Sequence, residues 1–176
     1  MTTRKITRMA IVIALYVGLT YAFSFMSYQG IQFRIAEVLI LLVFYKRDYA
    51  FPLIIACAIA NIPSPLGLLD VGIGTAATAL AVLGIVVVRH FRARFRHSWM
   101  ALLTASLFPV LFNALLVGWE LQIALDLPFW PSVLGVAIGE FTVVTVFGVA
   151  LFSVLSRNRT FSRLVFTDES FRSWEE

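Results

Sequence analysis

Three polar side chains open an apolar part of this chain: Gln32, Arg34 and Glu37, within the segment IQFRIAE at positions 31–37. If a helix begins near Arg34, then Arg34 and Glu37 are three residues apart and share one face. A charge inside a membrane segment costs about 2.5 to 3.5 kcal/mol, so it usually has a partner or a function. The segment therefore predicts one wall of an outward-facing solute site. The alternative is an Arg34–Glu37 ion pair that only fixes the first loop.

Glu140 is the acidic residue that we expect to lie deepest in the membrane. It follows Pro131, where a helix is expected to begin, by nine residues, and so lies about 14 Å along that helix, near the bilayer midplane. An unpaired carboxylate at this depth is costly and must face the interior of a helix bundle. We expect Glu140 to contact the solute. The alternative is a packing role, with hydrogen bonds to a Thr or Asn side chain.

Other polar and aromatic residues are candidates for the same site. Asn61 and Asn113 lie near the outer ends of predicted helices, where an amide either binds a ligand or satisfies the neighbouring backbone. Asp70 follows a turn with two prolines and either joins the site or caps the next helix. Phe33 and Trp119 are candidates to cover a flat ligand, although Trp119 also fits the aromatic belt at a membrane interface.

The composition predicts the kind of fold that positions these residues. The chain has 176 residues, 60% of them hydrophobic, and a mean hydropathy of +0.90, which is typical of a single membrane domain. We predict an all-α integral membrane protein, a bundle of six transmembrane helices at about 6–26, 34–45, 49–62, 71–88, 99–118 and 131–155, with a polar tail at 156–176. The second and third runs are short, and reading them as one re-entrant hairpin lowers the count to five or four.

The charges predict the orientation of this bundle. With the N-terminus inside, every Lys and Arg except Arg34 falls in a cytoplasmic segment, which predicts that both termini are cytoplasmic. The net charge of +4 is then a sign of topology and not of nucleic-acid binding. Five acidic residues fall at the outer boundary or in the outer halves of helices, and two of the five lie in a predicted loop at 119–130. They are Glu37, Asp70, Glu120, Asp126 and Glu140. Such a vestibule favours a cationic or hydrogen-bonding solute over an anion.

Several chemistries are not expected. The sequence has no Gly-rich phosphate loop with its Lys and Ser or Thr, so we expect no ATP binding of that type. Cys57 is the only cysteine, and no His, Cys and carboxylate cluster has metal-ligand spacing. Neither a Ser-His nor a Cys-His pair falls in the predicted membrane region. We therefore expect no catalytic residues, no metal and no cofactor.

Small residues recur every fourth position in the first run, at Ala10, Ala14, Gly18 and Ala22. This spacing makes a smooth ridge on one helix face, where another helix can approach closely. The ridge either packs inside the bundle or forms an external docking surface, and the sequence alone favours neither.

Three segments in this order resemble the queuosine-precursor transporter family: 31–37 (IQFRIAE), 59–77 (IANIPSPLGLLDVGIGTAA) and 139–149 (GEFTVVTVFGV). The resemblance implies the substrate-binding S component of an energy-coupling-factor (ECF) transporter, with an outward-facing site closed by the first and third loops. It also implies partners: a transmembrane scaffold subunit and two ATPase subunits, which would use the ATP. The Ala10-x-x-x-Ala14 pair looks like the motif by which S components dock on the scaffold, with Gly18 on the same ridge.

The implied substrate is a 7-deazaguanine, such as 7-aminomethyl-7-deazaguanine or queuine. Glu140 would accept hydrogen bonds from the ring N–H groups, and Asn113 or Arg34 would donate to the carbonyl edge. Glu37 or Asp70 would hold the cationic aminomethyl group. Three other functions stay open: an S component for another vitamin, a stand-alone ion-coupled carrier or channel that uses Glu140 as a proton site, and a structural membrane assembly protein.

Overall fold

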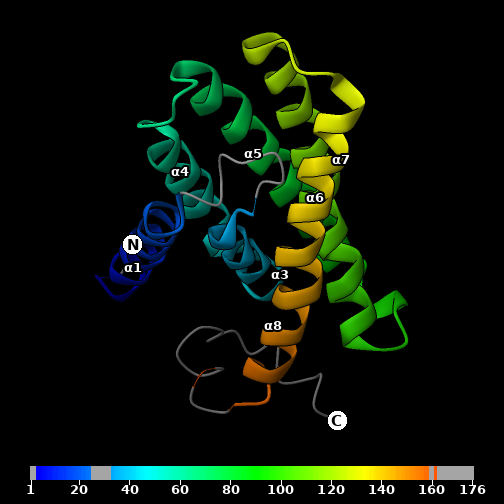
Figure 1. Cartoon of the computed structure of the whole chain (residues 1–176). Coiled ribbons are helices and arrows are strands. Elements are labelled where there is room, and N and C mark those ends of the chain that lie inside the picture. The colour runs from blue at the N-terminus through cyan, green and yellow to red at the C-terminus, as the bar shows by residue number, and fades with distance from the viewer. Residues whose placement is uncertain (1–2, 25–32, 159–160, 162–176) are drawn as a thin grey trace.

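The computed structural model describes residues 3–24, 33–158 and 161, and within them every regular element is a helix (Figure 1). Four helical stretches are long and apolar enough to cross a bilayer. They are α1 (Thr3–Ala22), α5 (Leu68–His90), α6 (Ser98–Leu125) and the continuous run Phe129–Leu155, which comprises α7, η4 and α8. The chain is a multi-pass membrane protein, as the composition predicts.

Two of the six predicted spans are shorter than a bilayer. The 3-10 helix η1 (Ile35–Leu41) leads directly into α3 (Leu42–Tyr45), and a further short turn, η2 (Arg47–Tyr49), precedes α4 (Ala50–Asn61). Crossing the hydrocarbon core takes about 20 helical residues, so neither η1–α3 nor α4 spans it alone. The six-helix count therefore stays a prediction.

The η1–α3 segment is the centre of the hydrophobic core. Ile40, Leu41 and Val43 are fully buried, and Phe44 is nearly so. Figure 1 shows this segment between α1 and α4 on one side and α6 and α8 on the other. The segment is too short to cross the bilayer by itself and carries the buried Glu37, a residue that is costly to place against lipid, so it lies inside the bundle.

Glycines bring α5, α6 and α7 close together, as the small residues of the predicted fourth helix indicate. A Cβ at Gly118 of α6 would lie 2.5 Å from Val133 Cγ2 of α7 (Phe129–Glu140). A Cβ at Gly84 of α5 would collide with the ring of Phe108 on α6. Only a residue without a side chain permits these approaches, so the three helices form a tightly packed half of the bundle.

The end of α6 differs from the prediction. The sequence predicts that this helix ends near Gly118 and that a loop follows at 119–130, but α6 continues to Leu125. The added stretch contains good helix formers and neither Gly nor Pro. Asp126, in the left-handed conformation (φ 52°), ends the helix, and Pro128 follows shortly after. Glu120 is therefore a helical residue.

The last predicted helix contains a π-helix. α7 ends at Glu140, η4 (Phe141–Gly148) follows with π-helical turns, and α8 (Val149–Leu155) completes the run. A π-helical segment is rare and often found at functional sites. Here it begins directly after a buried acidic residue.

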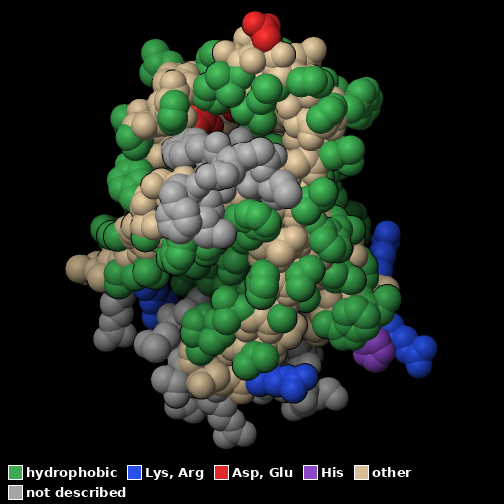
Figure 2. Space-filling model, in the orientation of Figure 1, with side chains coloured by type: hydrophobic (Ala, Val, Ile, Leu, Met, Phe, Trp, Pro, Cys, Tyr) green, Lys and Arg blue, Asp and Glu red, His purple; other side chains and the backbone are tan. Residues whose placement is uncertain are grey.

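Charges of opposite sign gather at opposite ends of the molecule. Figure 2 shows acidic side-chain atoms towards one end, some of them recessed among apolar side chains, and Lys and Arg side chains over the other half. This separation agrees with the charge pattern on which the predicted orientation depends. The orientation in the membrane stays a prediction.

Candidate functional site

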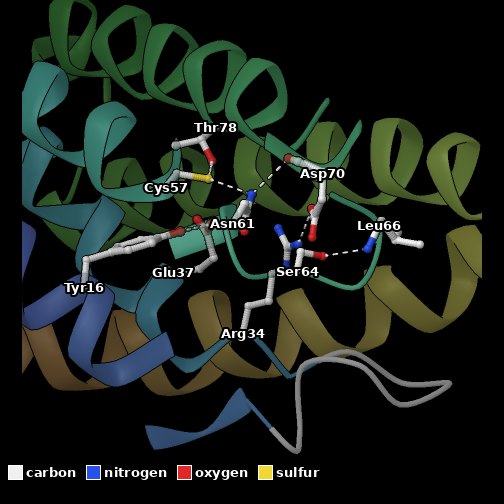
Figure 3. A network of polar contacts seen from close by, with 9 residues as sticks. All are labelled: Tyr16, Arg34, Glu37, Cys57, Asn61, Ser64, Leu66, Asp70 and Thr78. Carbon is white, nitrogen blue, oxygen red and sulfur yellow. Dashed lines mark hydrogen bonds and ion pairs between the residues drawn. The ribbon is translucent and has the colours of Figure 1, made fainter. Parts of the chain in front are cut away.

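Arg34 and Asp70 form an ion pair that joins the residue before η1 to the first turn of α5. Arg34 Nη2 donates to Asp70 Oδ1 at 3.2 Å, and the two side chains are 12% and 4% exposed. Figure 3 shows the guanidinium reaching from the residue before η1 to the first turn of α5. The helix cap of α5 is Gly67. The structure therefore supports neither the capping role considered for Asp70 nor the ion pair considered between Arg34 and Glu37.

Glu37 is anchored at one oxygen and open at the other. Its side chain is fully buried, and Oε1 accepts a hydrogen bond of 2.5 Å from the Tyr16 hydroxyl of α1 (Figure 3). Oε2 has no hydrogen-bond partner among the described residues. The residue is thus held in position by α1 and keeps one acceptor available.

Asn61 holds the start of α5 in place. Its Nδ2 donates to the main-chain oxygen of Asp70 at 3.1 Å and contacts Cys57 Sγ at 3.6 Å, and Thr78 Oγ1 donates to the same sulfur at 3.1 Å. A Cβ at Gly74 would lie 2.5 Å from Asn61 Nδ2, so the glycine makes room for this amide. Of the two roles considered for Asn61, the structure shows the contact with the neighbouring backbone.

Polar residues follow each other at intervals of seven along one face of α6: Ser106, Asn113 and Glu120, each fully buried. Seven residues are close to two helical turns, so all three face the same way. Ser106 contacts Thr145 Oγ1 of η4 at 3.1 Å. Both polar atoms of Asn113 and both carboxylate oxygens of Glu120 lack a hydrogen-bond partner within the described part of the chain.

Glu140 is fully buried in the bundle, as an unpaired carboxylate at its expected depth requires. Neither of its oxygens has a hydrogen-bond partner among the residues that the structure describes. It lies beside Asn113, although not in the geometry of a hydrogen bond, and it interacts electrostatically with Glu37 and Arg34. Helices α6 and α7 and the segment before η1 thus direct their polar groups to one region.

We call Glu37, Asn113, Glu120 and Glu140 the open polar cluster, because each has buried atoms without a partner. Leaving a buried polar group without a hydrogen bond costs about 1 to 3 kcal/mol, and more for a charged group. Proteins retain such groups where a ligand, an ion or ordered water satisfies them. The cluster offers mainly acceptors, with one amide as a donor, so it suits a solute that is rich in N–H groups.

The remaining predicted residues lie outside this cluster. Gln32 is outside the described residues. Phe33 is half-buried and packs against the core at the edge of the site, whereas Trp119 is 51% exposed, so the structure does not bring it to the cluster. In the described part of the chain, no group of His, Cys, Asp and Glu is arranged to hold a metal ion.

The ridge of small residues lies on the outside of the bundle. Ala10, Ala14, Gly18 and Ala22 are all exposed, and a Cβ at Gly18 would have nothing within 4 Å. The opposite side of α1 packs through Val12 and Tyr16. The ridge is therefore not used for packing within this chain.

Glu120 is the member of the cluster that the sequence analysis did not assign to the site. Because Glu120 was expected in an outer loop, it was not grouped with Asn113. In the structure α6 continues to Leu125, and both residues lie on one face of this helix. The sequence pattern that could have identified Glu120 is the seven-residue spacing of Ser106, Asn113 and Glu120 in an apolar stretch.

Comparisons with known proteins identify relatives over nearly the whole chain. The family described as "QueT transporter" matches residues 6–157. A protein named "Queuosine precursor transporter QueT" from Lactococcus lactis subsp. cremoris (strain MG1363) is 30% identical over 167 residues, which cover 92% of this chain and 97% of the relative. No solved structure matches significantly.

Proposed function

Because this chain belongs to the QueT transporter family, we propose that it binds a queuosine precursor and mediates its uptake across the membrane. The ligand is a 7-deazaguanine such as 7-aminomethyl-7-deazaguanine or queuine. The observation that carries the proposal is the open polar cluster, whose buried atoms have no partner among the described residues. A ligand with matching donors and acceptors removes that cost.

The hydrogen-bonding groups of the base match those of Glu140 and Asn113. The guanine edge presents adjacent N–H donors, and Glu140 has two free carboxylate oxygens to accept them. Asn113 lies beside Glu140 and has a free amide N–H for the carbonyl oxygen of the base. Hydrogen bonds to an ionised acceptor are about twice as strong as neutral ones, so Glu140 supplies most of the affinity.

The charge of the site excludes anionic solutes. Glu37, Glu120 and Glu140 are buried acidic residues, and the guanidinium of Arg34 is already paired with Asp70. The field of such a site attracts cations and repels phosphates and carboxylates. A nucleotide is therefore rejected, while a free base with a cationic arm is accepted.

We further propose that the protein is an S component of an ECF transporter, with both termini cytoplasmic. ATP is then hydrolysed by two partner subunits, which agrees with the missing phosphate loop in this sequence. The exposed ridge of Ala10, Ala14 and Gly18 is the surface for the scaffold subunit. Small residues let the backbones of two membrane helices approach closely, and this ridge has no such partner within the described chain.

One observation favours a second candidate, a stand-alone ion-coupled carrier. Buried carboxylates without partners inside a membrane protein are also typical of proton relays. Purified protein in liposomes separates the two functions. An S component alone does not transport the solute without its ATPase partners, whereas uptake driven by a proton gradient in their absence would show the carrier.

A thermal-shift panel of purines, deazapurines and vitamins on the purified protein tests the ligand. We expect a concentration-dependent rise of the melting temperature with 7-deazaguanines and none with nucleotides. Stabilisation by an unrelated vitamin, with no response to any deazaguanine, would identify an S component for another substrate. A protein that no small solute stabilises would fit a structural role in assembly.

A further inference from the structure

Glu120 is fully buried, yet both of its carboxylate oxygens lack a hydrogen-bond partner in the described part of the chain. It lies within electrostatic range of the Arg34–Asp70 ion pair. Along α6 it is seven residues from Asn113, about 10 Å on the same face. A bicyclic base with a short arm is about this long.

Asp70 and Glu37 each already have a hydrogen-bond partner. Asp70 accepts a hydrogen bond from the Arg34 guanidinium, and one oxygen of Glu37 accepts from Tyr16. Glu140 lies beside Asn113, where the two side chains together match the donors and the carbonyl of a guanine edge. Glu120 is left as a second acceptor with both oxygens free, about two turns along α6 from Asn113.

We infer that Glu120 determines the charge class of the substrate: it binds a protonated amine on the arm of the base, while Glu140 and Asn113 bind the ring edge. The inference rests on the proposed function and reassigns the cationic group from Glu37 or Asp70 to Glu120. An ammonium group has three donors, so it satisfies both carboxylate oxygens and neutralises one buried charge. A neutral arm of the same size supplies no counter-ion for this carboxylate.

Two ligands of nearly the same shape, one cationic and one neutral, test the inference. We would measure the affinity of the purified full-length protein for 7-aminomethyl-7-deazaguanine and for 7-hydroxymethyl-7-deazaguanine, a neutral analogue of nearly the same shape. The wild-type protein should prefer the amine. Glu120→Gln should weaken binding of the amine by about 10- to 100-fold, the range of a charge-assisted hydrogen bond, and leave the affinity for the alcohol within about twofold.

Asp126→Asn is the matched control. Asp126 is an exposed acid six residues after Glu120, and its backbone is left-handed, a conformation that Asn tolerates well. The substitution removes the same charge from the same end of the molecule without entering the cluster. It should therefore leave both affinities unchanged.

The outcomes separate the inference from the proposed function. The inference is overturned if the wild-type protein binds the alcohol as tightly as the amine, a result that needs no variant. It is also overturned if Glu120→Gln weakens both ligands equally, or if Asp126→Asn has the same effect as Glu120→Gln. Binding of neither deazaguanine to the wild-type protein refutes the proposed function, and the inference with it.

Discussion

Replacing Glu140 by Gln should weaken ligand binding without lowering the stability of the ligand-free protein. The substitution keeps the shape of the side chain but removes a buried carboxyl group whose oxygens have no partner among the described residues. Without ligand, the free energy of unfolding should stay the same or rise, because a buried unpaired charge is costly. With ligand, the variant loses a charged acceptor of the ring N–H groups, and binding weakens.

The loss of affinity follows from the strength of such a hydrogen bond. A hydrogen bond to a charged group contributes about 1.5 to 3 kcal/mol, which corresponds to a Kd about 12- to 140-fold higher. At a ligand concentration of about 100 times the wild-type Kd, binding stabilises the wild-type protein by about 2.7 kcal/mol. The same concentration stabilises Glu140→Gln by only about 0.3 to 1.3 kcal/mol.

Calorimetric titration and thermal unfolding of the purified protein measure the two effects. Asp126→Asn serves again as the control, because it removes an exposed acidic charge directly after α6 and should change neither quantity. A Glu140→Gln variant with wild-type affinity and reduced stability would refute the reasoning. Glu140 would then be a packing residue that the fold requires.

Three further substitutions each test one contact. Arg34→Gln leaves a buried carboxylate without its partner and should lower stability by about 3 to 5 kcal/mol; a variant as stable as the wild type in thermal unfolding contradicts this. Gly74→Ala brings a Cβ within 2.5 Å of Asn61 Nδ2 and should cost about 1 to 3 kcal/mol, whereas Gly72→Ala, with nothing within 4 Å, should not destabilise. Ala14→Leu should keep ligand affinity but abolish uptake by cells that contain the whole transporter, and normal uptake would exclude the ridge as the docking surface.

Hydropathy and the cost of buried charge predict much of this molecule. The apolar runs identify the membrane helices, because only a hydrogen-bonded helix or barrel can cross a bilayer. The interior position of Glu140 follows from the same cost, since an unpaired carboxylate cannot face lipid. The structure shows Glu140 fully buried, and four of the six predicted runs are apolar helices of spanning length.

Which side chains pair with one another could not be predicted from the sequence. Arg34 and Asp70 are 36 positions apart, and sequence spacing instead suggested Glu37, three residues away, as the partner of Arg34. A pair between segments depends on how helices pack, which local spacing does not contain. The carboxylate of Glu37 is instead fixed by Tyr16 of α1.

The end of α6 shows a second limit. Trp119 and Glu120 look like the start of an interfacial loop because hydropathy falls there, but the backbone continues as a helix to Leu125. The polarity of a residue tells how costly it is to bury. It does not tell whether the helix turns that residue towards the interior or towards the surface. The 3-10 and π-helical turns of η1 and η4 were likewise not predictable from apolar periodicity.

The structure of the complex with 7-aminomethyl-7-deazaguanine tests most directly whether the open polar cluster is the binding site. We predict that the ring edge lies within hydrogen-bonding distance of Glu140 and Asn113, and the ammonium group within that of Glu120. A ligand bound elsewhere, with these side chains still without partners or bonded to one another, would contradict the assignment.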